Sequence, residues 1–258
     1  MIHKTSNELQ MKIPPHPTLT EFYPAPAERA RFVNDLFDRA AHDYDRMSWA
    51  LSLGTDRPYR RWALQQAGLK PGMRVLDVAT GTGLVAQAAL DSGVAHGDVV
   101  GLDASRGMLE ENRKHRALRL IQGFGEALPF RGATFDFIVM GYAMRHVEDL
   151  AALFAEFDRV LRNPGRVLIL EISRPSSRLA FALMGFYIQR LLPFLTRSTT
   201  RSPESARLMK YYWATIAECV PPASILGALS KTGFKPVERK TRGGILSEYL
   251  AAKGSDVR

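Results

Sequence analysis

The chain has 258 residues, of which 46% are apolar and 24% are charged. This balance is typical of a globular protein and excludes wholesale disorder. Cys219 is the single cysteine, so an internal disulfide is excluded, and with only six histidines no Cys-rich zinc site can be built. The net charge of +9 favours an anionic partner, such as nucleic acid or a membrane surface, without deciding between them.

Residues 1–27 contain no apolar core and therefore no secretory signal. Because this stretch also carries five prolines, we expect an extended or disordered arm there; they are Pro14, Pro15, Pro17, Pro24 and Pro26. The longest apolar run, Leu179–Ile188, is half the length of about twenty residues that a membrane-spanning helix needs. We expect a soluble, cytoplasmic protein that touches a membrane at most peripherally, on its inner face.

Apolar spacing predicts alternating helices and strands from residue 28 onward. Helices are expected over residues 28–46, 57–68, 84–90, 105–113 and 150–161. Strands are expected over residues 73–79, 99–103, 118–122, 135–140 and 167–172. This alternation is typical of an α/β fold with a doubly wound, mostly parallel sheet.

The last third of the chain departs from this alternation. Helices are expected over residues 178–195, 204–219 and 222–231, and strands over 234–242 and 245–252. Gly243 and Gly244 predict a hairpin, which makes the two strands an antiparallel pair. We expect a single domain over residues 28–258, with a helical N-terminal segment and a helical cap or insert at about 178–219.

A glycine-containing turn follows the first expected strand, in the segment RVLDVATGTGLVAQ. Gly81 and Gly83 allow the backbone to pass close to a ligand, and Asp77 stands near the end of the strand. Asp103 ends the second strand about twenty residues after the turn, where a carboxylate accepts hydrogen bonds from both hydroxyls of a ribose. Ligands of doubly wound sheets bind at these strand ends, so we expect a nucleoside site here.

This turn differs from the turn of a dinucleotide site. Ala79 stands at the first glycine position of the Gly-x-Gly-x-x-Gly pattern, and the third glycine is missing. The carboxylate of Asp77 would repel a phosphate, whereas it suits an amino group and a positive charge. S-adenosylmethionine carries a ribose, an amino-acid end and a sulfonium, without phosphate, and is therefore the expected cofactor. The alternative is a structural turn beside an unrelated strand-end aspartate.

From about Phe32 to Lys253 the chain resembles the ubiquinone/menaquinone biosynthesis C-methyltransferase family, in the class I methyltransferase fold. The resemblance rests on FDRAAHDYDRM, LSLG, LDVATGTG, GEALPF, MRHVED, RVLRNPGRVLILEIS and LSKTGFKPVE, which occur in the family's order. It implies a Rossmann-like sheet ending in an antiparallel strand pair and a small apolar, aromatic methyl acceptor. The first expectation is C-methylation of a prenylated quinol ring in quinone biosynthesis.

The resemblance also implies roles for individual positions. The cofactor positions are Thr82, Asp103, Phe124, Gly125 and Gly141. Tyr44 would close the pocket over the methionine end, and Arg145 would face the substrate. The chain departs from the family's usual residues at Ser48, Asp56, Tyr59, Phe124 and His146. These departures leave the cofactor expectation in place and bear mainly on the acceptor.

A ring carbon is a poor nucleophile unless a neighbouring phenol loses its proton. His146 titrates in the useful range and is expected as the base, whereas Arg145 is expected to stabilise the phenolate or polarise a water. The alternatives are a hydrogen-bonded loop histidine and an arginine paired with Asp149 or Glu148. Tyr142 is expected either to line the acceptor pocket or to pack in the core.

The segment Leu179–Leu195 is the candidate contact for an apolar acceptor, as a lid or as a helix that dips into a membrane surface. Its flanking arginines would meet anionic headgroups; they are Arg178, Arg190, Arg197 and Arg201. The alternative is a helix buried against the sheet. The aromatic side chains at 211–213 either clamp an aromatic ring or pack in the core.

Other functions stay open at this point. Another phenol, a prenyl chain or a lipid amine is the alternative acceptor, and a non-catalytic member of a quinone-biosynthesis assembly is the alternative to an enzyme. Nucleic acid is not expected as a partner, because the basic residues are spread along the chain and no base-flipping motif occurs. A homodimer is a further expectation, and no metal is expected.

Overall fold

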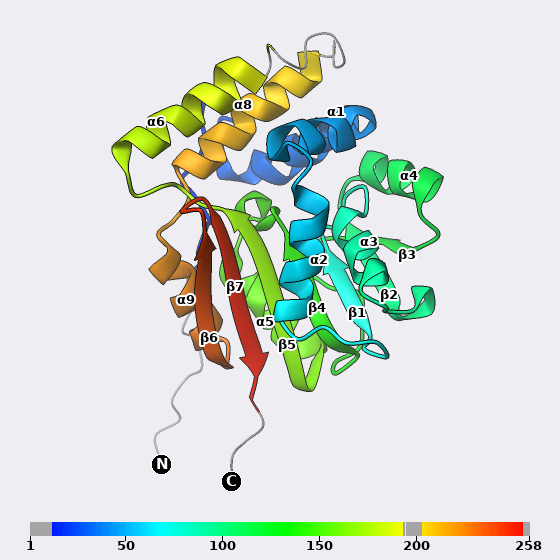
Figure 1. Ribbon diagram of the computed structural model, residues 1–258. Coiled ribbons are helices and arrows are strands. Elements are labelled where there is room, and N and C mark those ends of the chain that lie inside the picture. Colours follow the sequence, from blue (N-terminus) through cyan, green and yellow to red (C-terminus); the bar gives the residue numbers. More distant parts are fainter. Residues whose placement is uncertain (1–11, 193, 195–202, 255–258) are drawn as a thin grey trace, which may run out of the picture.

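The computed structural model describes residues 12–192, 194 and 203–254 (Figure 1). Its centre is a seven-stranded sheet in the order β3-β2-β1-β4-β5-β7-β6. The strands are β1 (Val75–Val78), β2 (Val99–Asp103), β3 (Arg119–Gln122), β4 (Phe135–Gly141), β5 (Leu161–Ile172), β6 (Phe234–Arg242) and β7 (Leu246–Lys253). The first five strands are parallel and β7 is antiparallel to both β5 and β6. The expected fold class is confirmed.

Helices cover both faces of this sheet. On one face lie α5 (Leu150–Val160) and α9 (Pro222–Lys231), whose apolar side chains join the larger core cluster. On the other face lie α2 (Asp56–Gln66) and α3 (Leu84–Asp91). All residues of β1 and β2 are buried, as expected for central parallel strands covered from both sides.

A third group of helices lies above the carboxyl ends of the parallel strands (Figure 1). It comprises α1 (Arg29–Ser52), α6 (Arg178–Phe186), the π-helical turn η4 (Tyr187–Leu191) and α8 (Pro203–Ala217). Three of these elements share a separate core, in which Leu36 of α1, Ile188 of η4 and Leu208 of α8 are buried. We name these four elements the cap. It sits where the ligands of doubly wound sheets bind.

The remaining helices are short connectors and one edge helix. They are the 3-10 turns η1 (Pro26–Glu28), η2 (His96–Asp98) and η3 (Met144–His146), and the helix α4 (Arg106–His115). The hydroxyl of Ser105 accepts a hydrogen bond from the Met108 amide at the start of α4, which is the N-cap expected from the sequence.

Residues 12–27, the described part of the expected arm, pack onto the domain. The amide of Ile13 donates to Asp149, and the carbonyl of Pro15 accepts from the Val220 amide. His16 and Tyr23 are buried. This segment therefore contributes to the core beside α5 and α8.

Two expected boundaries differ from the structure by six residues. Helix α1 continues to Ser52, six residues beyond its expected end at 46, because its last turns pack against η4 and α8. Strand β5 begins at Leu161 instead of 167, because Leu161 pairs with Phe135 before an irregularity in the ladder. Residues 193 and 195 of the helix expected over 178–195 lie outside the described residues.

Candidate functional site

Two adjoining cavities lie between the sheet and the cap. The first cavity, about 820 Å³ including its open mouth, lies at the carboxyl ends of β1, β2 and β4 and is covered by α1. Among the residues that line it are Val33, Phe37, Gly81, Asp103, Phe124 and Gly141. The second cavity, about 1010 Å³ including its mouth, lies among α1, α2, α6, η4 and α8.

The turn after β1 shapes the floor of the first cavity. Ala79, Gly81 and Gly83 have φ angles of 55°, 55° and 90°, in the left-handed region that favours glycine. A Cβ at Gly83 would lie 2.6 Å from Nδ2 of Asn112, whereas a Cβ at Gly81 would meet open space. Gly83 therefore serves the packing against α4, and Gly81 leaves room for a ligand.

Asp103 holds the end of β2 against this turn. Its Oδ2 accepts from the Gly81 amide at 2.7 Å and its Oδ1 from the Ser105 amide at 2.8 Å. Burial raises the pKa of Asp103 to about 6, and the nearby Asp38 carboxylate adds to the rise. Each oxygen keeps a further lone pair, so the carboxylate can accept from both hydroxyls of a ribose.

Asp77 lies behind the cavity wall. Its Oδ2 accepts from the Thr80 hydroxyl at 2.7 Å and from the Ala86 amide at 3.0 Å. Its Oδ1 is buried without a hydrogen-bond partner among the described residues. Burial raises the pKa of Asp77 to about 7. These contacts fix the turn from below, so Asp77 supports the site without lining it.

Two acidic residues fasten α1 over the first cavity. Asp45 accepts a hydrogen bond from the hydroxyl of Thr82. Asp38 accepts from the Ser105 hydroxyl and, at 2.8 Å, from the amide of Gly107. Thr82, expected as a cofactor contact, thus holds the covering helix and lies outside the cavity lining.

The other expected cofactor positions line the first cavity. Phe124 is 48% exposed, and its ring stands at the cavity wall where it can stack on a flat base. A Cβ at Gly125 would lie 2.7 Å from Cδ1 of Leu153, and one at Gly141 would lie 2.6 Å from Cγ2 of Val85. Glycine at these positions lets the core close directly beneath the cavity.

The charge of the first cavity favours a cationic ligand. Its lining includes the carboxyl groups of Asp103, Glu126 and Glu148 and, among the described residues, no lysine or arginine. Burial raises the pKa of Glu126. A phosphate would be repelled here, whereas a sulfonium and an amino group are attracted. The residues therefore fit the adenosyl, sulfonium and amino-acid parts of S-adenosylmethionine.

Three tyrosines separate the first cavity from the second. Tyr44, Tyr142 and Tyr212 line both cavities. The hydroxyls of Tyr44 and Tyr212 lie 3.1 Å apart, and Tyr142 adopts a left-handed φ of 60°. Burial raises the pKa of all three phenols. We name these residues the tyrosine partition; they stay protonated near neutral pH and can donate hydrogen bonds to either side.

Arg145 is fully buried behind the tyrosine partition and outside the lining of both cavities. Its Nε donates to Glu171 at 2.6 Å, and its Nη1 donates to the Thr215 hydroxyl at 2.7 Å. Its guanidinium also lies 4.9 Å from the ring centre of Tyr212. The alternative from the sequence was an ion pair of Arg145 with Asp149 or Glu148. The structure shows that its ion-pair partner is Glu171 on β5.

His146 lines the first cavity through its ring, which packs against aromatic neighbours. Its ring centre lies 5.1 Å from that of Phe37 and 5.4 Å from that of Tyr211. Both ring nitrogens are buried without a partner among the described residues. Burial holds the pKa of His146 well below its usual value, and the neighbouring Arg145 adds to this. The imidazole is therefore neutral near pH 7.

The second cavity combines residues of the segment Leu179–Leu195, the candidate acceptor contact in the sequence, with residues that sequence reasoning did not assign to the site. Its walls are mainly apolar and include Met47, Leu51, Met184, Ile188 and Leu246. At one end lies an ion pair between Asp56 and Arg60, 2.6 Å apart. The i,i+4 spacing of this pair on α2 is visible in the sequence. The segments that face this pair come from distant parts of the chain, so the cavity itself cannot be seen in the sequence.

Comparisons with known proteins agree with this architecture. A sequence profile of the ubiE/COQ5 methyltransferase family matches residues 25–253. The demethylmenaquinone methyltransferase of Beutenbergia cavernae is 35% identical over 223 residues, which cover 86% of this chain and 90% of that protein. The ubiquinone/menaquinone biosynthesis C-methyltransferase UbiE of Citrifermentans bemidjiense is 32% identical over 235 residues, covering 88% and 98%.

A solved structure shows the same fold. The SAM-dependent methyltransferase of Thermotoga maritima aligns with a TM-score of 0.59 and 19% identity, over 85% of this chain and 99% of that chain. The family match confirms the resemblance seen in the sequence, and with it the expected class of S-adenosylmethionine-dependent methyltransferase. The chain belongs to the ubiE/COQ5 methyltransferase family.

Proposed function

We propose that this enzyme methylates a ring carbon of a prenylated quinol. The observation that carries the proposal is the second cavity, which is large, mainly apolar and separated from the first only by the tyrosine partition. A quinol ring with an apolar tail matches such a cavity in chemistry. The relatives named demethylmenaquinone methyltransferase and UbiE support a quinone precursor as the acceptor.

S-adenosylmethionine supplies an electrophilic methyl group when it is bound. In this proposal Asp103 accepts hydrogen bonds from the ribose, Phe124 packs on the adenine, and Gly81 leaves space for the backbone to approach the ligand. The tyrosine partition orients the two reactants, and the cap keeps water out. Holding two reactants in an aligned geometry contributes much of the rate enhancement in reactions of this kind.

Arg145 and His146, the catalytic residues expected from the sequence, take indirect roles in this proposal. Arg145 donates weakly to the carbonyls of Tyr142 and Tyr212, at 3.5 and 3.4 Å, and thereby braces the tyrosine partition. Its positive charge also favours an acceptor that loses a proton nearby. His146, neutral and aromatic, supports α1 through Phe37.

The proposal is tested by the position of a transferred label. Purified protein is incubated with methyl-labelled S-adenosylmethionine and a short-prenyl 1,4-naphthoquinol kept reduced, and the product is analysed by mass spectrometry and NMR. We expect one labelled methyl group on the ring carbon beside the prenyl chain. The matched acceptors are a simple phenol, a prenyl alcohol and phosphatidylethanolamine. Label on a hydroxyl oxygen, label on the amine of phosphatidylethanolamine, or no label on the naphthoquinol would contradict the proposal.

A second proposal concerns how such an acceptor reaches the enzyme. No helix among the described residues is long and apolar enough to span a bilayer. The outward face of α6 is nevertheless apolar, because Leu179, Leu183 and Phe186 are each at least 60% exposed. We propose that this face docks on an anionic membrane surface, with Arg178 and Arg190 meeting the headgroups.

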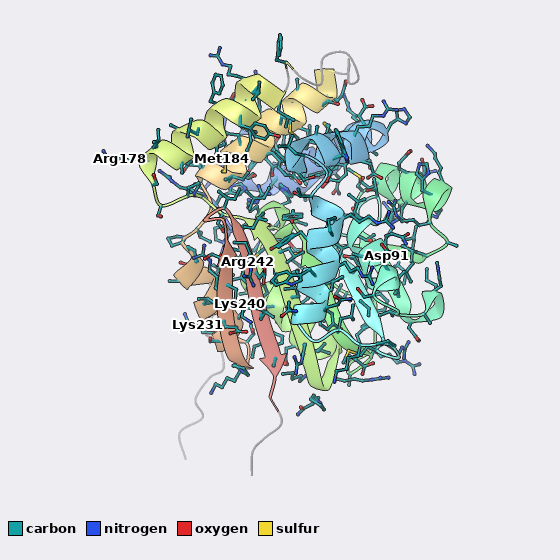
Figure 2. All side chains as sticks on the ribbon, viewed as in Figure 1. Asp91, Arg178, Met184, Lys231, Lys240 and Arg242 are labelled. Atoms are coloured by element: carbon teal, nitrogen blue, oxygen red, sulfur yellow. The ribbon has the colours of Figure 1, made fainter. Side chains whose placement is uncertain are left out.

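The position of α6 supports membrane docking. Met184 and Ile188 line the second cavity from the inner side of the same helical segment whose outer side is exposed. Figure 2 shows Arg178 and Met184 on α6, at the edge of the molecule away from Lys231 and Lys240. An apolar acceptor could then pass from the bilayer to the cavity without crossing water. The expected homodimer is the other occupant that an exposed apolar face favours.

Vesicle binding separates these occupants. We expect flotation with phosphatidylglycerol vesicles and loss of flotation in the double variant Arg178→Glu/Arg190→Glu. The control is Lys231→Glu/Lys240→Glu, which makes the same change in net charge on α9 and β6, below α6 in Figure 2, and should float like the native protein. Equal losses in both variants would show a non-specific charge effect. A dimer in sedimentation that dissociates in Phe186→Ser, with no flotation, would assign the face to a second copy.

A further inference from the structure

The second cavity contains one feature that the proposed function does not yet use, a carboxylate beside the tyrosine partition. Asp56 begins α2 and lines the cavity, and its side chain is 14% exposed. Its Oδ2 pairs with Arg60, whose own side chain is 6% exposed. Asp56 is the only carboxylate among the described residues that line the second cavity. A half-buried carboxylate in a mainly apolar ligand cavity is a candidate for proton transfer.

The contacts of Asp56 leave one oxygen available to a ligand. Oδ1 lies 3.4 Å from the hydroxyl of Tyr142, and Oδ2 lies 3.5 Å from that of Ser48. Both distances exceed the usual 2.5–3.0 Å of an O–H···O hydrogen bond. A hydroxyl of an acceptor could therefore displace these weak contacts from Asp56 and still leave the strong pair with Arg60 intact.

Asp56 lies next to the tyrosine partition, where the proposed function places the methyl transfer. Tyr142, its neighbour, lines both cavities and belongs to the tyrosine partition. The guanidinium of Arg60 lies 5.0 Å from the ring centre of Tyr142, so the ion pair and the partition form one cluster. Burial raises the pKa of the tyrosines in the cluster, so their hydroxyls stay protonated and no phenolate is present to take a proton. Asp56 is the group in this cluster that can accept a proton.

Resting on the proposed quinol substrate, we propose that Asp56 is the catalytic base, which takes the proton of the acceptor hydroxyl during methyl transfer. The ring carbon forms a bond to the methyl carbon, and the carbon–sulfur bond breaks with its electron pair remaining on sulfur. The hydroxyl proton passes to Asp56, which leaves a carbonyl and a methylated ring carbon that still carries hydrogen. That hydrogen leaves as a proton to water while Asp56 returns its proton to the oxygen. One proton is released overall.

A carboxylate is strong enough for this step because the hydroxyl changes character during the reaction. A free phenol has a pKa near 10 and would not lose its proton to a carboxylate. As the ring carbon takes the methyl group, the hydroxyl becomes that of a protonated carbonyl, which is a far stronger acid. Transfer to Asp56 is then downhill, so the base acts in the transition state and not before it.

The test replaces Asp56 without changing its shape. We expect Asp56→Asn to lower kcat for the short-prenyl 1,4-naphthoquinol by about 10²–10⁴-fold, the range typical of a lost general base. Calorimetric affinity for adenosylhomocysteine should stay within about twofold. The matched control is Asp91→Asn, which removes the ion pair that α2 makes through Arg57, 2.9 Å away, outside the cavity (Figure 2). This control should retain native turnover.

A binding measurement gives a readout that does not depend on turnover. With adenosylhomocysteine present, native protein should bind the naphthoquinol more tightly than its dimethyl ether, which has no hydroxyl to donate. Asp56→Asn should reduce this preference, and Asp91→Asn should keep it. A native solvent deuterium isotope effect on kcat should disappear in Asp56→Asn.

Two results would overturn the role of Asp56. The first is a kcat in Asp56→Asn within threefold of the native value. The second is a parallel loss of binding for the quinol and for the ether, which would make Asp56 a structural residue. If the native protein methylates no quinol but Asp56→Asn still changes the preference for quinol over ether, the proposed function fails and Asp56 remains the hydroxyl contact.

Discussion

The first and second cavities are built in different ways, although they share a wall. The first is formed by strand ends and tight turns, and Asp103 is held there by two backbone amides. The second is formed by side chains of α1, α2, α6, η4 and α8 that meet from distant parts of the chain. Backbone geometry thus fixes the first cavity, which we propose for the methyl donor, whereas side-chain identity sets the second, which we propose for the acceptor. Changes at the two ends should therefore have separable effects.

The largest loss of stability is expected from a change at Arg145, which lies behind the tyrosine partition. Arg145 links β5, through Glu171, to Thr215 of α8. Arg145→Ala leaves the Glu171 carboxylate buried and unpaired, so we expect the free energy of unfolding to fall by about 3–5 kcal/mol. Urea unfolding measures this. The exposed pair of Arg57 is the control, and Arg57→Ala should cost less than about 1 kcal/mol. Similar losses of unfolding free energy in the two variants would show that Arg145 does not stabilise the contact between β5 and α8.

The next largest effect is a loss of affinity for adenosylhomocysteine, which we expect only from changes in the first cavity. Asp103→Asn keeps the shape of the side chain and removes the charged acceptor for the ribose hydroxyls. We expect adenosylhomocysteine to bind about 100-fold more weakly, equivalent to about 3 kcal/mol, by calorimetry. Met184→Ala, in the second cavity, should leave this affinity within about twofold. If Met184→Ala weakens donor binding as much, the two ends of the site are not separable.

The glycine turn should show an intermediate effect. Gly83→Ala places a Cβ 2.6 Å from Asn112 at a φ of 90°, and we expect about 2 kcal/mol of lost stability. Gly81→Ala carries a similar backbone cost but meets no atom within 4 Å, so it should unfold more like the native protein and instead weaken donor binding. Thermal unfolding and calorimetry distinguish the two. The reverse pattern would mean that the ligand approaches at Gly83.

The smallest effect is a pH dependence. Burial raises the pKa of Asp103 to about 6, and only its ionised form accepts from both ribose hydroxyls. Donor affinity should be constant above about pH 7 and about tenfold weaker at pH 5, because roughly one site in ten is then ionised. The stability of the fold depends on pH in the opposite direction. Because the pKa of Asp103 is higher in the folded protein than in the unfolded chain, protonation of Asp103 stabilises the folded state as the pH falls. A pH series of calorimetric titrations should lose this dependence in Asp103→Asn.

The same contrast explains what could be predicted from the sequence. The glycine turn after β1 and the aspartate at the end of β2 leave local signals in spacing and composition, and the structure places Gly81 and Asp103 at one cavity. Asp77, expected from its charge near the strand end, and Thr82, expected from the family resemblance, both lie outside the cavity lining: Asp77 bonds Thr80 behind the cavity, and Thr82 bonds Asp45 of the covering helix. A sequence pattern places a residue on an element but does not say which side of a tight turn it faces.

The second cavity has one local signal of this kind, the apolar segment Leu179–Leu195, from which Met184 and Ile188 line the cavity. Arg145 and His146 follow β4 at the carboxyl edge of the sheet, as expected, but Arg145 pairs with Glu171 outside both cavities, and the ring nitrogens of His146 are buried without a partner among the described residues. The ion pair of Asp56 and Arg60 becomes part of a site only because α1, η4 and α8 close around it. Such long-range packing depends on the whole fold and is invisible to helix and strand periodicity.

The central claim is that donor and acceptor occupy the first and second cavities, on the two sides of the tyrosine partition. A crystal structure of the protein with adenosylhomocysteine tests it most directly. We predict that the ribose hydroxyls lie within hydrogen-bond distance of Asp103 and that the sulfur faces the hydroxyls of Tyr44, Tyr142 and Tyr212. A ligand in the second cavity, or a ribose without contact to Asp103, would contradict the account.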